Sequence, residues 1–232
     1  MPRVFVAPGT FPDIVGPDVH YLRDVLRLKP NDELELLDGT GLVHSAKIST
    51  ITPERVVCQV LGSRPSASEP ATKITLAQAL PKSFKMDFIV EKCTELGVAR
   101  IIPMLTARTI AKGIKLDRWR KLAKEAAEQS GRAIIPEISA ALNFSEVLKL
   151  KGQFDLALIP WEQEKTNGLK SLLRSNNPSS LLILIGPEGG FTPEEVQSAT
   201  KVGFHSVSLG KRIMRTETAG LATLANITYE LG

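Results

Sequence analysis

The stretch that decides the fold is Leu181–Glu195 (LLILIGPEGGFTPEE), in which a short apolar run leads directly into a glycine-rich turn. A second stretch, Ser208–Ala219 (SLGKRIMRTETA), also places a glycine turn between an apolar run and the start of a helix. Apolar runs bounded by glycine are typical of buried parallel strands, and open α/β sheets bind ligands at strand ends. The two turns therefore predict one small-molecule site. Glycines that simply turn the chain are the competing interpretation.

The residues after the first turn indicate what this ligand is. Thr192 suits a helix N-cap, Pro193 suits the first helical position, and Glu195 can close a capping box. A phosphate at this helix end would meet Glu188 and Glu194 as well, and no Lys occupies the Walker position. We therefore reject a nucleoside triphosphate. A ligand with a neutral base and a cationic centre fits the local charge better.

The second turn leads into a final helix over residues 218–231 that is apolar on nearly every side. Such a helix has to be buried, inside its domain, against a second subunit, or both. Arg215 and Glu217 stand at the start of this helix, beside the turn. Two interpretations of this pair remain open: a salt bridge with a favourable acid in the first turn, or a catalytic pair.

The region before these turns alternates between strand and helix patterns, which predicts a parallel sheet covered by helices. The expected strands are Ile74–Leu80, Arg100–Met104, Asp155–Ile159 and Leu181–Ile185. The expected helix faces contain Phe84, Phe88, Ile89, Cys93 and Leu96 in one helix, and Trp119, Leu122, Ala123, Ala126 and Gln129 in another. The inward Gln129 requires a partner, and a hydrogen bond within the core is the simplest one.

The N-terminal region reads instead as short strands joined by tight turns, which predicts a small barrel. The expected strands are Arg3–Val6, Glu33–Leu37, Gly41–Ser49 and Arg55–Leu61, and the expected helix face contains Val19, Leu22, Val25 and Leu26. Gly62–Pro70 is rich in Ser and Pro and lacks periodicity, so it is the predicted linker between two domains.

Charge is distributed unevenly along the 232 residues, whose net charge is +4. Residues 1–71 hold 7 basic and 9 acidic residues, whereas residues 72–232 hold 22 and 16. Residues 100–124 contain eight basic residues, Lys112 among them, and one acid, Asp117. This stretch is either a phosphate-binding surface or a solvated helix face.

Other compositional features narrow the class of protein. The sequence indicates no signal peptide and no run long enough to span a bilayer, so we expect a cytoplasmic protein. The two cysteines, Cys58 and Cys93, lack metal-binding or disulfide spacing, so we expect no metal site.

Five motifs together resemble the bacterial 16S ribosomal RNA uridine-N3-methyltransferases of the SPOUT superfamily, in order along essentially the whole chain. They are His20–Arg27, Lys85–Gly97, Glu125–Arg132, Gly186–Thr192 and Leu209–Ala219. The last two are diagnostic in combination. One departure is Met214, where Leu is usual; both are apolar and similar in volume, so we expect no loss of function.

The resemblance implies a fold and a set of partners. Residues 1–71 would form a PUA-like β-barrel that binds RNA, and residues 72–232 an α/β SPOUT domain with a deep trefoil knot. The enzyme would be a homodimer that transfers a methyl group from S-adenosylmethionine to N3 of a uridine in 16S rRNA of the small ribosomal subunit, releasing S-adenosylhomocysteine.

The resemblance and the position of the turns also imply roles for residues. The cofactor would lie against Ile159, Pro160, Ile185, Gly186, Gly190, Leu209, Gly210, Ile213, Met214, Thr218 and Ala219. Our hypothesis for catalysis is that Arg215 stabilises negative charge on a uracil oxygen, while Glu217 orients Arg215 or accepts the proton. RNA would be bound by Arg3, Arg23, Arg27, Lys82, Lys85, Arg108 and Arg132, with Arg23 and Arg27 on one helix face. Gln129 and Arg132 would help to shape the pocket across the dimer.

Two other functions remain open at this point. The first is a non-catalytic RNA-binding or ribosome-assembly factor that kept the fold, and the second is a SPOUT methyltransferase that acts on another RNA position.

Overall fold

The computed structural model describes residues 1–110 and 113–231, so Lys112 of the basic stretch lies outside the described residues. The chain divides into two compact units. The first comprises residues 1–69 together with 127–135, and the second comprises residues 70–126 together with residues from 136 onward. The segment 127–135, which follows the expected domain boundary at residue 71, therefore groups with the first unit.

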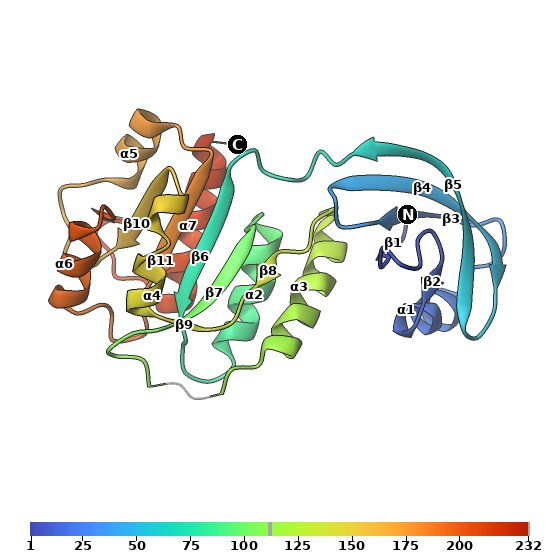
Figure 1. Cartoon of the computed structure of the whole chain (residues 1–232), viewed down its shortest axis with the longest axis horizontal. Coiled ribbons are helices and arrows are strands. Elements are labelled where there is room, and N and C mark those ends of the chain that lie inside the picture. Colours follow the sequence, from blue (N-terminus) through green and yellow to red (C-terminus); the bar gives the residue numbers. More distant parts are fainter. Residues whose placement is uncertain (111–112, 232) are drawn as a thin grey trace. The chain divides into compact units, whose positions relative to one another are not determined.

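The first unit is built on a five-stranded sheet with the order β1-β3-β4-β5-β2 (Figure 1). Strand β1 (Arg3–Phe5) pairs in parallel with β3 (Glu33–Leu37), which has its predicted bounds. The remaining pairs are antiparallel and involve β4 (Leu42–Ile51), β5 (Arg55–Pro65) and the short β2 (Ile14–Val15). Buried residues from these strands, including Val4, Leu34 and Ile48, form the core of this unit.

The predicted N-terminal helix is shorter and less regular than its periodicity indicated. It consists of α1 (Pro17–His20) followed by a π-helical turn, η1 (Tyr21–Val25). Val19 and Leu22 are buried as predicted, but Val25 and Leu26 are 58% and 37% exposed. The prediction of a four-residue face was wrong because the helix ends at Val25.

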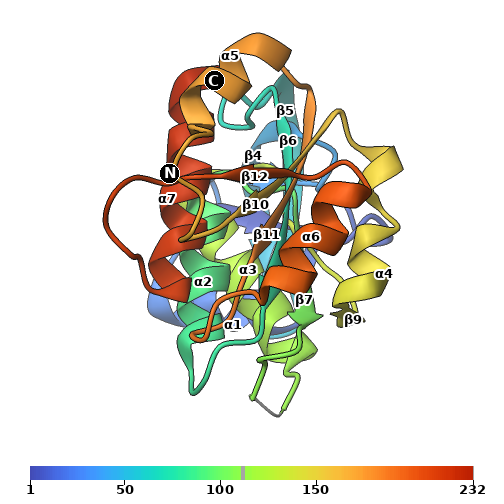
Figure 2. The same cartoon turned by 90° about the vertical axis from the view of Figure 1, so that its left-hand side faces the viewer.

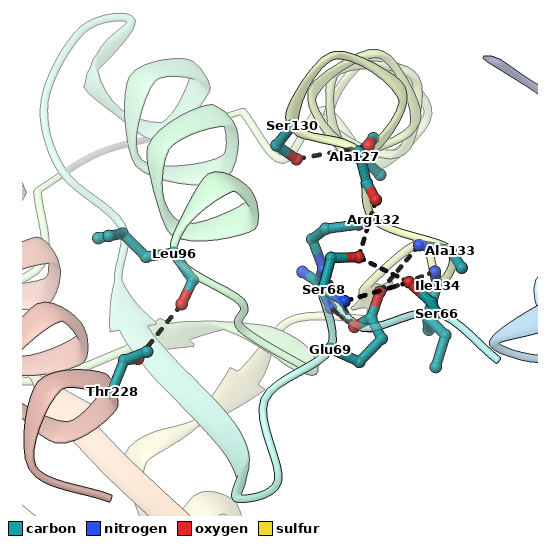
Figure 3. A network of polar contacts seen from close by, with 11 residues as sticks. Ser66, Ser68, Glu69, Leu96, Ala127, Ser130, Arg132, Ala133, Ile134 and Thr228 are labelled. Atoms are coloured by element: carbon teal, nitrogen blue, oxygen red, sulfur yellow. Dashed lines mark hydrogen bonds and ion pairs between the residues drawn. The ribbon is translucent and has the colours of Figure 1, made fainter. Parts of the chain in front are cut away.

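The predicted linker is also partly ordered, because β5 continues to Pro65 in register with β4. Beyond it, the Glu69 carboxylate accepts hydrogen bonds from the backbone N–H groups of Ala133 and Ile134 and from the guanidinium of Arg132, at 2.8 Å (Figure 3). Arg132 is only 3% exposed. This network fixes residues 66–69 against the segment 127–135 within the first unit.

The second unit contains a seven-stranded sheet in which every described pair is parallel, which confirms the predicted α/β class. Its order is β12-β10-β11-β6-β7-β8, and β9 also pairs with β7. The strands are β6 (Lys73–Ala79), β7 (Arg100–Leu105), β8 (Glu137–Ile138), β9 (Leu142–Asn143), β10 (Leu156–Pro160), β11 (Ser180–Ile185) and β12 (His205–Val207). Strand β11 lies between β10 and β6, and Leu181–Ile185 are each at most 2% exposed. Each such side chain stabilises the fold by about 1.5–3 kcal/mol through burial.

Helices cover both faces of this sheet (Figure 2). On one face lie α2 (Lys85–Glu95), α5 (Leu169–Asn176) and α7 (Thr216–Leu231), and on the other lie α4 (Phe144–Leu148) and α6 (Pro193–Lys201). The remaining helical elements are α3 (Leu116–Ser130) and the 3₁₀ turn η2 (Lys151–Gln153). Among the described residues, none of the helices combines the length and apolar character that a membrane span requires.

Two predicted helix faces need correction. Ile89 and Cys93 of the predicted face of α2 are buried, together with Met86 and Val90, but Phe84 and Phe88 are 71% and 46% exposed. Gln129 was expected to face inward, but it is exposed, whereas its neighbours Ala126 and Ala127 are buried. The inward face of α3 therefore turns away from Gln129 near the end of the helix.

Helix α7 is buried on one side only within a single chain. Gly220, Leu224 and Ile227 face the domain, whereas Tyr229 is 89% exposed and Ala225 is also exposed. An exposed apolar side is unusual for a helix of this composition. Part of the burial predicted for this helix therefore does not occur within a single subunit.

Candidate functional site

The candidate site lies where three neighbouring strands end. Strands β10, β11 and β12 are parallel, so their carboxyl ends share one edge of the sheet. The segments that follow these strands line a cavity of about 460 Å³, together with Lys85 and Ala219. The segments are Pro160–Glu162, Gly186–Phe191 and Leu209–Thr216, of which only Lys211 is outside the lining. The two glycine turns thus meet, as the sequence predicted.

The first turn is shaped by two glycines. Gly190 has φ = +67°, a backbone conformation that favours glycine. A Cβ on Gly186 would lie 3.3 Å from the Gly190 carbonyl carbon and the Phe191 ring, and a Cβ on Gly190 would lie 3.1 Å from the Glu162 carboxylate. The turn is therefore a close-packed backbone surface at the wall of the cavity.

The helix that follows holds this turn in place. Thr192 caps α6 and Glu195 closes the capping box, at 3.2 and 2.9 Å, which confirms the predicted helix start. The other carboxylate oxygen of Glu195 accepts a hydrogen bond from the backbone of Ala107 at 2.8 Å, and Arg108 donates to the Gly189 carbonyl at 2.7 Å. These bonds connect the turn to the loop after β7.

Most of the predicted cofactor residues gather at this cavity, although their role remains a prediction. The lining includes Pro160, Ile185, Gly186, Gly190, Leu209, Gly210, Ile213, Met214 and Ala219. Ile159 is fully buried and Thr218 is exposed, and neither lines the cavity. Ile159 lies within β10, one residue before the strand reaches the cavity.

A buried polar chain joins the two turns. Gln78, which is fully buried in β6, donates to the Thr216 hydroxyl at 2.9 Å, and Thr216 donates to the Gly186 carbonyl at 2.5 Å. Neither Gln78 nor Thr216 was singled out by sequence reasoning. The signal for Gln78 was a single amide within the apolar strand ITLAQAL.

The two predicted catalytic residues do not pair with one another. Arg215 is exposed and lines the cavity, whereas Glu217 is outside the lining and lies 3.2 Å from the ammonium of Lys85. Lys85 also lies 3.4 Å from Glu188. The expectation that Glu217 orients Arg215 is therefore wrong, because Glu217 contacts Lys85 instead.

Hydrogen bonding controls the charge of these groups. The interaction with Glu217 raises the pKa of Lys85 above its ordinary value, against a weaker opposing effect of burial, and Glu188 contributes in the same direction. Burial opposes ionisation of Glu188, but hydrogen bonds from the backbone of Lys82 and from Lys85 outweigh it and lower the pKa of that carboxyl. At neutral pH the site therefore holds a protonated Lys85 beside an ionised Glu188.

The residues predicted to bind RNA have different surroundings. Lys82 is exposed, and Lys85 belongs to the cavity. Arg108 is exposed but holds the first glycine turn through its bond to Gly189. A surface role remains open for Lys82 and Arg108, and Lys85 is better assigned to the cavity itself.

In the first unit, two of the predicted RNA-binding residues keep an accessible charge. Arg23 pairs with Asp24 at 2.7 Å, and Arg27 is exposed with φ = +55° beyond the end of the helix. The prediction that Arg23 and Arg27 share a helix face is wrong because η1 ends at Val25. Arg3 is half-buried and bonds Glu35 at 2.6 Å.

Arg132 is placed differently from the prediction. Its side chain is 3% exposed and bonds Glu69, so it does not present a charge to RNA. The exposed Gln129 and the buried Arg132 both belong to the first unit, and neither lines the described cavity. Sequence reasoning missed the partner because Glu69 lies 63 residues away, in the predicted linker.

Two protein families match successive parts of the chain. A family of RNA methyltransferase PUA domains matches residues 15–61, and a family of RNA methyltransferase domains matches residues 68–228. The ribosomal RNA small subunit methyltransferase E of Bacillus subtilis is 35% identical over 228 residues, which cover 94% of this chain and 89% of that protein. The chain belongs to this methyltransferase family. The motif resemblance is thereby confirmed at the level of the family.

Other members of the family extend the comparison. The protein of the same name from Synechocystis is 39% identical over 97% of this chain and 76% of its own length. The Neisseria gonorrhoeae ribosomal RNA small subunit methyltransferase E, solved bound to S-adenosyl methionine, superimposes with a TM-score of 0.86 at 32% identity and covers 99% and 97% of the two chains. A Legionella pneumophila structure with bound SAM gives a TM-score of 0.84 at 28% identity, covering 98% and 96%.

Proposed function

We propose that this protein transfers a methyl group from S-adenosylmethionine to N3 of a uridine in 16S rRNA of the small ribosomal subunit. The observation that carries the proposal is the cavity at the ends of β10, β11 and β12, whose walls are largely backbone and apolar side chains. Membership of the small subunit methyltransferase E family supports ribosomal RNA as the substrate. Such an enzyme works in the cytoplasm, where ribosomes are assembled.

The residues of the cavity suit this cofactor. Gly186 and Gly190 leave room for close approach, Leu209, Ile213 and Met214 offer apolar surface for an adenine, and Glu162 supplies negative charge for cationic groups. The bound cofactor supplies an electrophilic methyl group on a sulfonium. The cofactor without this methyl group is a neutral thioether, S-adenosylhomocysteine. The positive charge that the sulfonium loses leaves as the N3 proton, which goes to solvent.

The acceptor atom sets two demands on the protein. Uridine N3 carries a proton at neutral pH, and its lone pair is available only after that proton leaves. The atom also lies on the pairing edge, so the target base must be unpaired. Arg215, which is exposed at the cavity, stabilises the negative charge that develops on a uracil oxygen.

Arg215→Ala tests this role. We expect the transfer rate to fall by about 10²–10³-fold, as for the loss of one charge-stabilising donor, with the affinity for S-adenosylmethionine unchanged. Full turnover by a folded Arg215→Ala variant would contradict the assignment.

Domain roles follow from the same proposal. Residues 1–71 act as a PUA-like β-barrel that binds RNA, with Arg23, Arg27 and Arg3 as contacts. Residues 72–232 form the SPOUT domain, in which the chain after β11 and β12 is tied into a deep trefoil knot around the cofactor. The hydrogen bond from Thr216, at the buried start of α7, to the Gly186 carbonyl brings the two turns into contact, as such a knot requires.

A homodimer accounts for the exposed side of α7. Tyr229 on α7 has a large, partly apolar side chain that is 89% exposed in a single chain. Burial of this side against a second copy would satisfy the composition of the helix. Sedimentation of the wild type and of Tyr229→Asp tests this point, because a charge at the interface should favour the monomer.

Two alternatives are separated by one biochemical experiment. Purified protein is titrated with S-adenosylmethionine by calorimetry and then incubated with small-subunit rRNA and methyl-labelled cofactor. Binding and the appearance of 3-methyluridine support the proposal. A folded protein that fails to bind the cofactor favours an RNA-binding or assembly factor, and label on another atom favours a methyltransferase of different specificity.

A further inference from the structure

Three charged side chains from three separate elements meet beside the cavity. Lys85 is the first residue of α2, Glu188 lies in the turn after β11, and Glu217 lies in the first turn of α7. The Lys85 ammonium lies 3.4 Å from Glu188 and 3.2 Å from Glu217. Glu188 and Glu217 follow Lys85 by 103 and 132 positions in the sequence, so only the fold brings the three together.

Only part of this cluster faces the cavity. Lys85 and Glu188 belong to the lining and keep 33% and 30% of their side-chain surface exposed. Glu217 is outside the lining and its side chain is only 16% exposed, although its carboxylate lies 3.2 Å from the ammonium. The group that can reach a substrate in the cavity is therefore the ammonium, and not the Glu217 carboxylate.

The ammonium is held in place before any substrate binds. Ser83 has φ = +60°, which turns the chain sharply just before α2, and the backbone N–H of Lys82 donates to Glu188 at 2.9 Å. The turn that carries Lys85 is thus attached to the glycine turn of the cavity wall. A donor held in this way loses little entropy when it bonds a substrate.

Two carboxylates around one ammonium also decide its protonation. They favour the charged form of Lys85, which makes it a hydrogen-bond donor and unsuitable as a general base. The two carboxylates also offset the positive charge of Lys85 next to a cationic cofactor. A lysine without such partners would oppose the binding of a sulfonium ion in the same cavity.

We propose that Lys85 is a catalytic residue that donates a hydrogen bond to an exocyclic oxygen of the target uracil, and that Glu217 is the positioning residue that holds Lys85. This inference rests on the proposed methyl transfer to N3. As the N3–H bond breaks, its proton goes to solvent and its electron pair stays on the ring, shared between N3 and the oxygens. The N3 electron pair then forms the N–CH₃ bond as the S–CH₃ bond of S-adenosylmethionine breaks and leaves its electron pair on the sulfur of the neutral thioether, while Lys85 keeps its own proton throughout.

The test compares Lys85→Met with Lys92→Met, a matched control on the same helix. Lys92 also lies between two carboxylates, Glu91 and Glu95, at 2.7 Å each, but it does not line the cavity. Single-turnover methyl transfer is measured on 16S rRNA and on the same RNA transcribed with 5-fluorouridine. Fluorine withdraws electrons, so N3 is more acidic and its anion needs less stabilisation by the enzyme. Calorimetry with S-adenosylmethionine monitors the cofactor site.

We expect Lys85→Met to transfer about 10²–10³-fold more slowly on uridine RNA, with cofactor affinity within about threefold of wild type. On 5-fluorouridine RNA its deficit relative to Lys92→Met should shrink by at least about tenfold, because the substrate then needs the donor less. Lys85→Arg should recover part of the rate, and Glu217→Gln should lose about tenfold. Should Lys85→Met fail to fold, Lys85→Gln is measured in the same way.

Four results would overturn the inference. A Lys85→Met rate equal to that of Lys92→Met would remove Lys85 from the chemistry, with the methyltransferase function intact. An equal deficit on both RNAs, or loss of cofactor binding, would make Lys85 a purely structural bridge. Absence of 3-methyluridine with the wild type would instead overturn the proposed function, and this inference with it.

Discussion

The Thr216 hydroxyl donates a 2.5 Å hydrogen bond to the Gly186 carbonyl and accepts one from Gln78 at 2.9 Å. This pair of bonds connects the start of α7 to the glycine turn after β11 and to the centre of the sheet. The two turns that form the cavity are therefore fixed to one another by a single buried side chain. Thr216 is 5% exposed, so a water molecule cannot take the place of its hydroxyl in these hydrogen bonds.

Thr216→Val keeps the shape of the side chain but removes its hydroxyl. It leaves the buried amide of Gln78 without this acceptor, so we expect a loss of about 1–3 kcal/mol in the free energy of unfolding. The affinity for S-adenosylmethionine should fall as well, because the turns lose their connection. Chemical denaturation and calorimetry measure the two effects. Thr216→Ser, which restores the hydroxyl, should behave like wild type, and an equal loss in Ser and Val variants would contradict this account.

Gly190→Ala tests the backbone surface of the cavity. The residue has φ = +67°, so the substitution strains the backbone by about 1–2 kcal/mol, and its Cβ also meets the Glu162 carboxylate at 3.1 Å. We expect a lower free energy of unfolding and weaker cofactor binding. Gly39→Ala is the control: φ is +79° there, and a Cβ would meet no atom within 4 Å. Gly39→Ala should lower the free energy of unfolding without changing the affinity for the cofactor. An equal effect of both variants on cofactor affinity would argue against a close approach of the cofactor to Gly190.

Glu69→Ala tests the network of the first unit. Arg132 is 3% exposed and bonds Glu69, which also accepts hydrogen bonds from the backbone N–H groups of Ala133 and Ile134, so removal of the carboxylate takes away an ion pair and two hydrogen bonds at a buried site. We expect a loss of about 3 kcal/mol in the free energy of unfolding, which chemical denaturation can measure. Glu54→Ala, at an exposed acid of the same unit, should change stability by less than about 0.5 kcal/mol. Similar values for the two variants would mean that the Glu69 network contributes little.

Glu164 gives the stability a defined dependence on pH. Hydrogen bonds from Thr166, followed by that from the Asn167 backbone, lower the pKa of this carboxyl from 4.5 to about 2. A lowered pKa in the folded state means that the stabilisation is present above pH 4.5 and is lost as the pH falls towards 2. Glu164→Gln should therefore unfold at a lower temperature than wild type at pH 7, with the difference narrowing in acid. A difference that stayed constant from pH 7 to below pH 3 would contradict this assignment.

The features that sequence predicted well are those set by neighbouring residues. The capping box of Thr192 and Glu195 and the apolar strand Leu181–Ile185 follow rules that act within a few positions. Their order along the chain was enough to predict a parallel sheet and a site at its strand ends. The family motifs then supplied the cofactor and the reaction.

The features that sequence missed depend on contacts between distant segments. Pairing of Glu217 with Lys85 could not be foreseen, because charge pattern suggested the nearer Arg215 as the partner. Gly220 lies inside α7, and a Cβ there would lie 3.3 Å from the Gln78 side chain, so the close approach of α7 to β6 accounts for the glycine. Arg132 was assigned to RNA because its motif, Glu125–Arg132, gives no sign of a buried partner 63 residues away.

The most direct test of the central claim is mass spectrometry of nucleosides from small-subunit rRNA. The rRNA comes from cells without this protein, and from the same cells supplied with wild type or with Arg215→Ala. We predict that 3-methyluridine disappears in the absence of the protein, returns with wild type, and stays absent or strongly reduced with Arg215→Ala. Unchanged 3-methyluridine in cells that lack the protein would contradict the account.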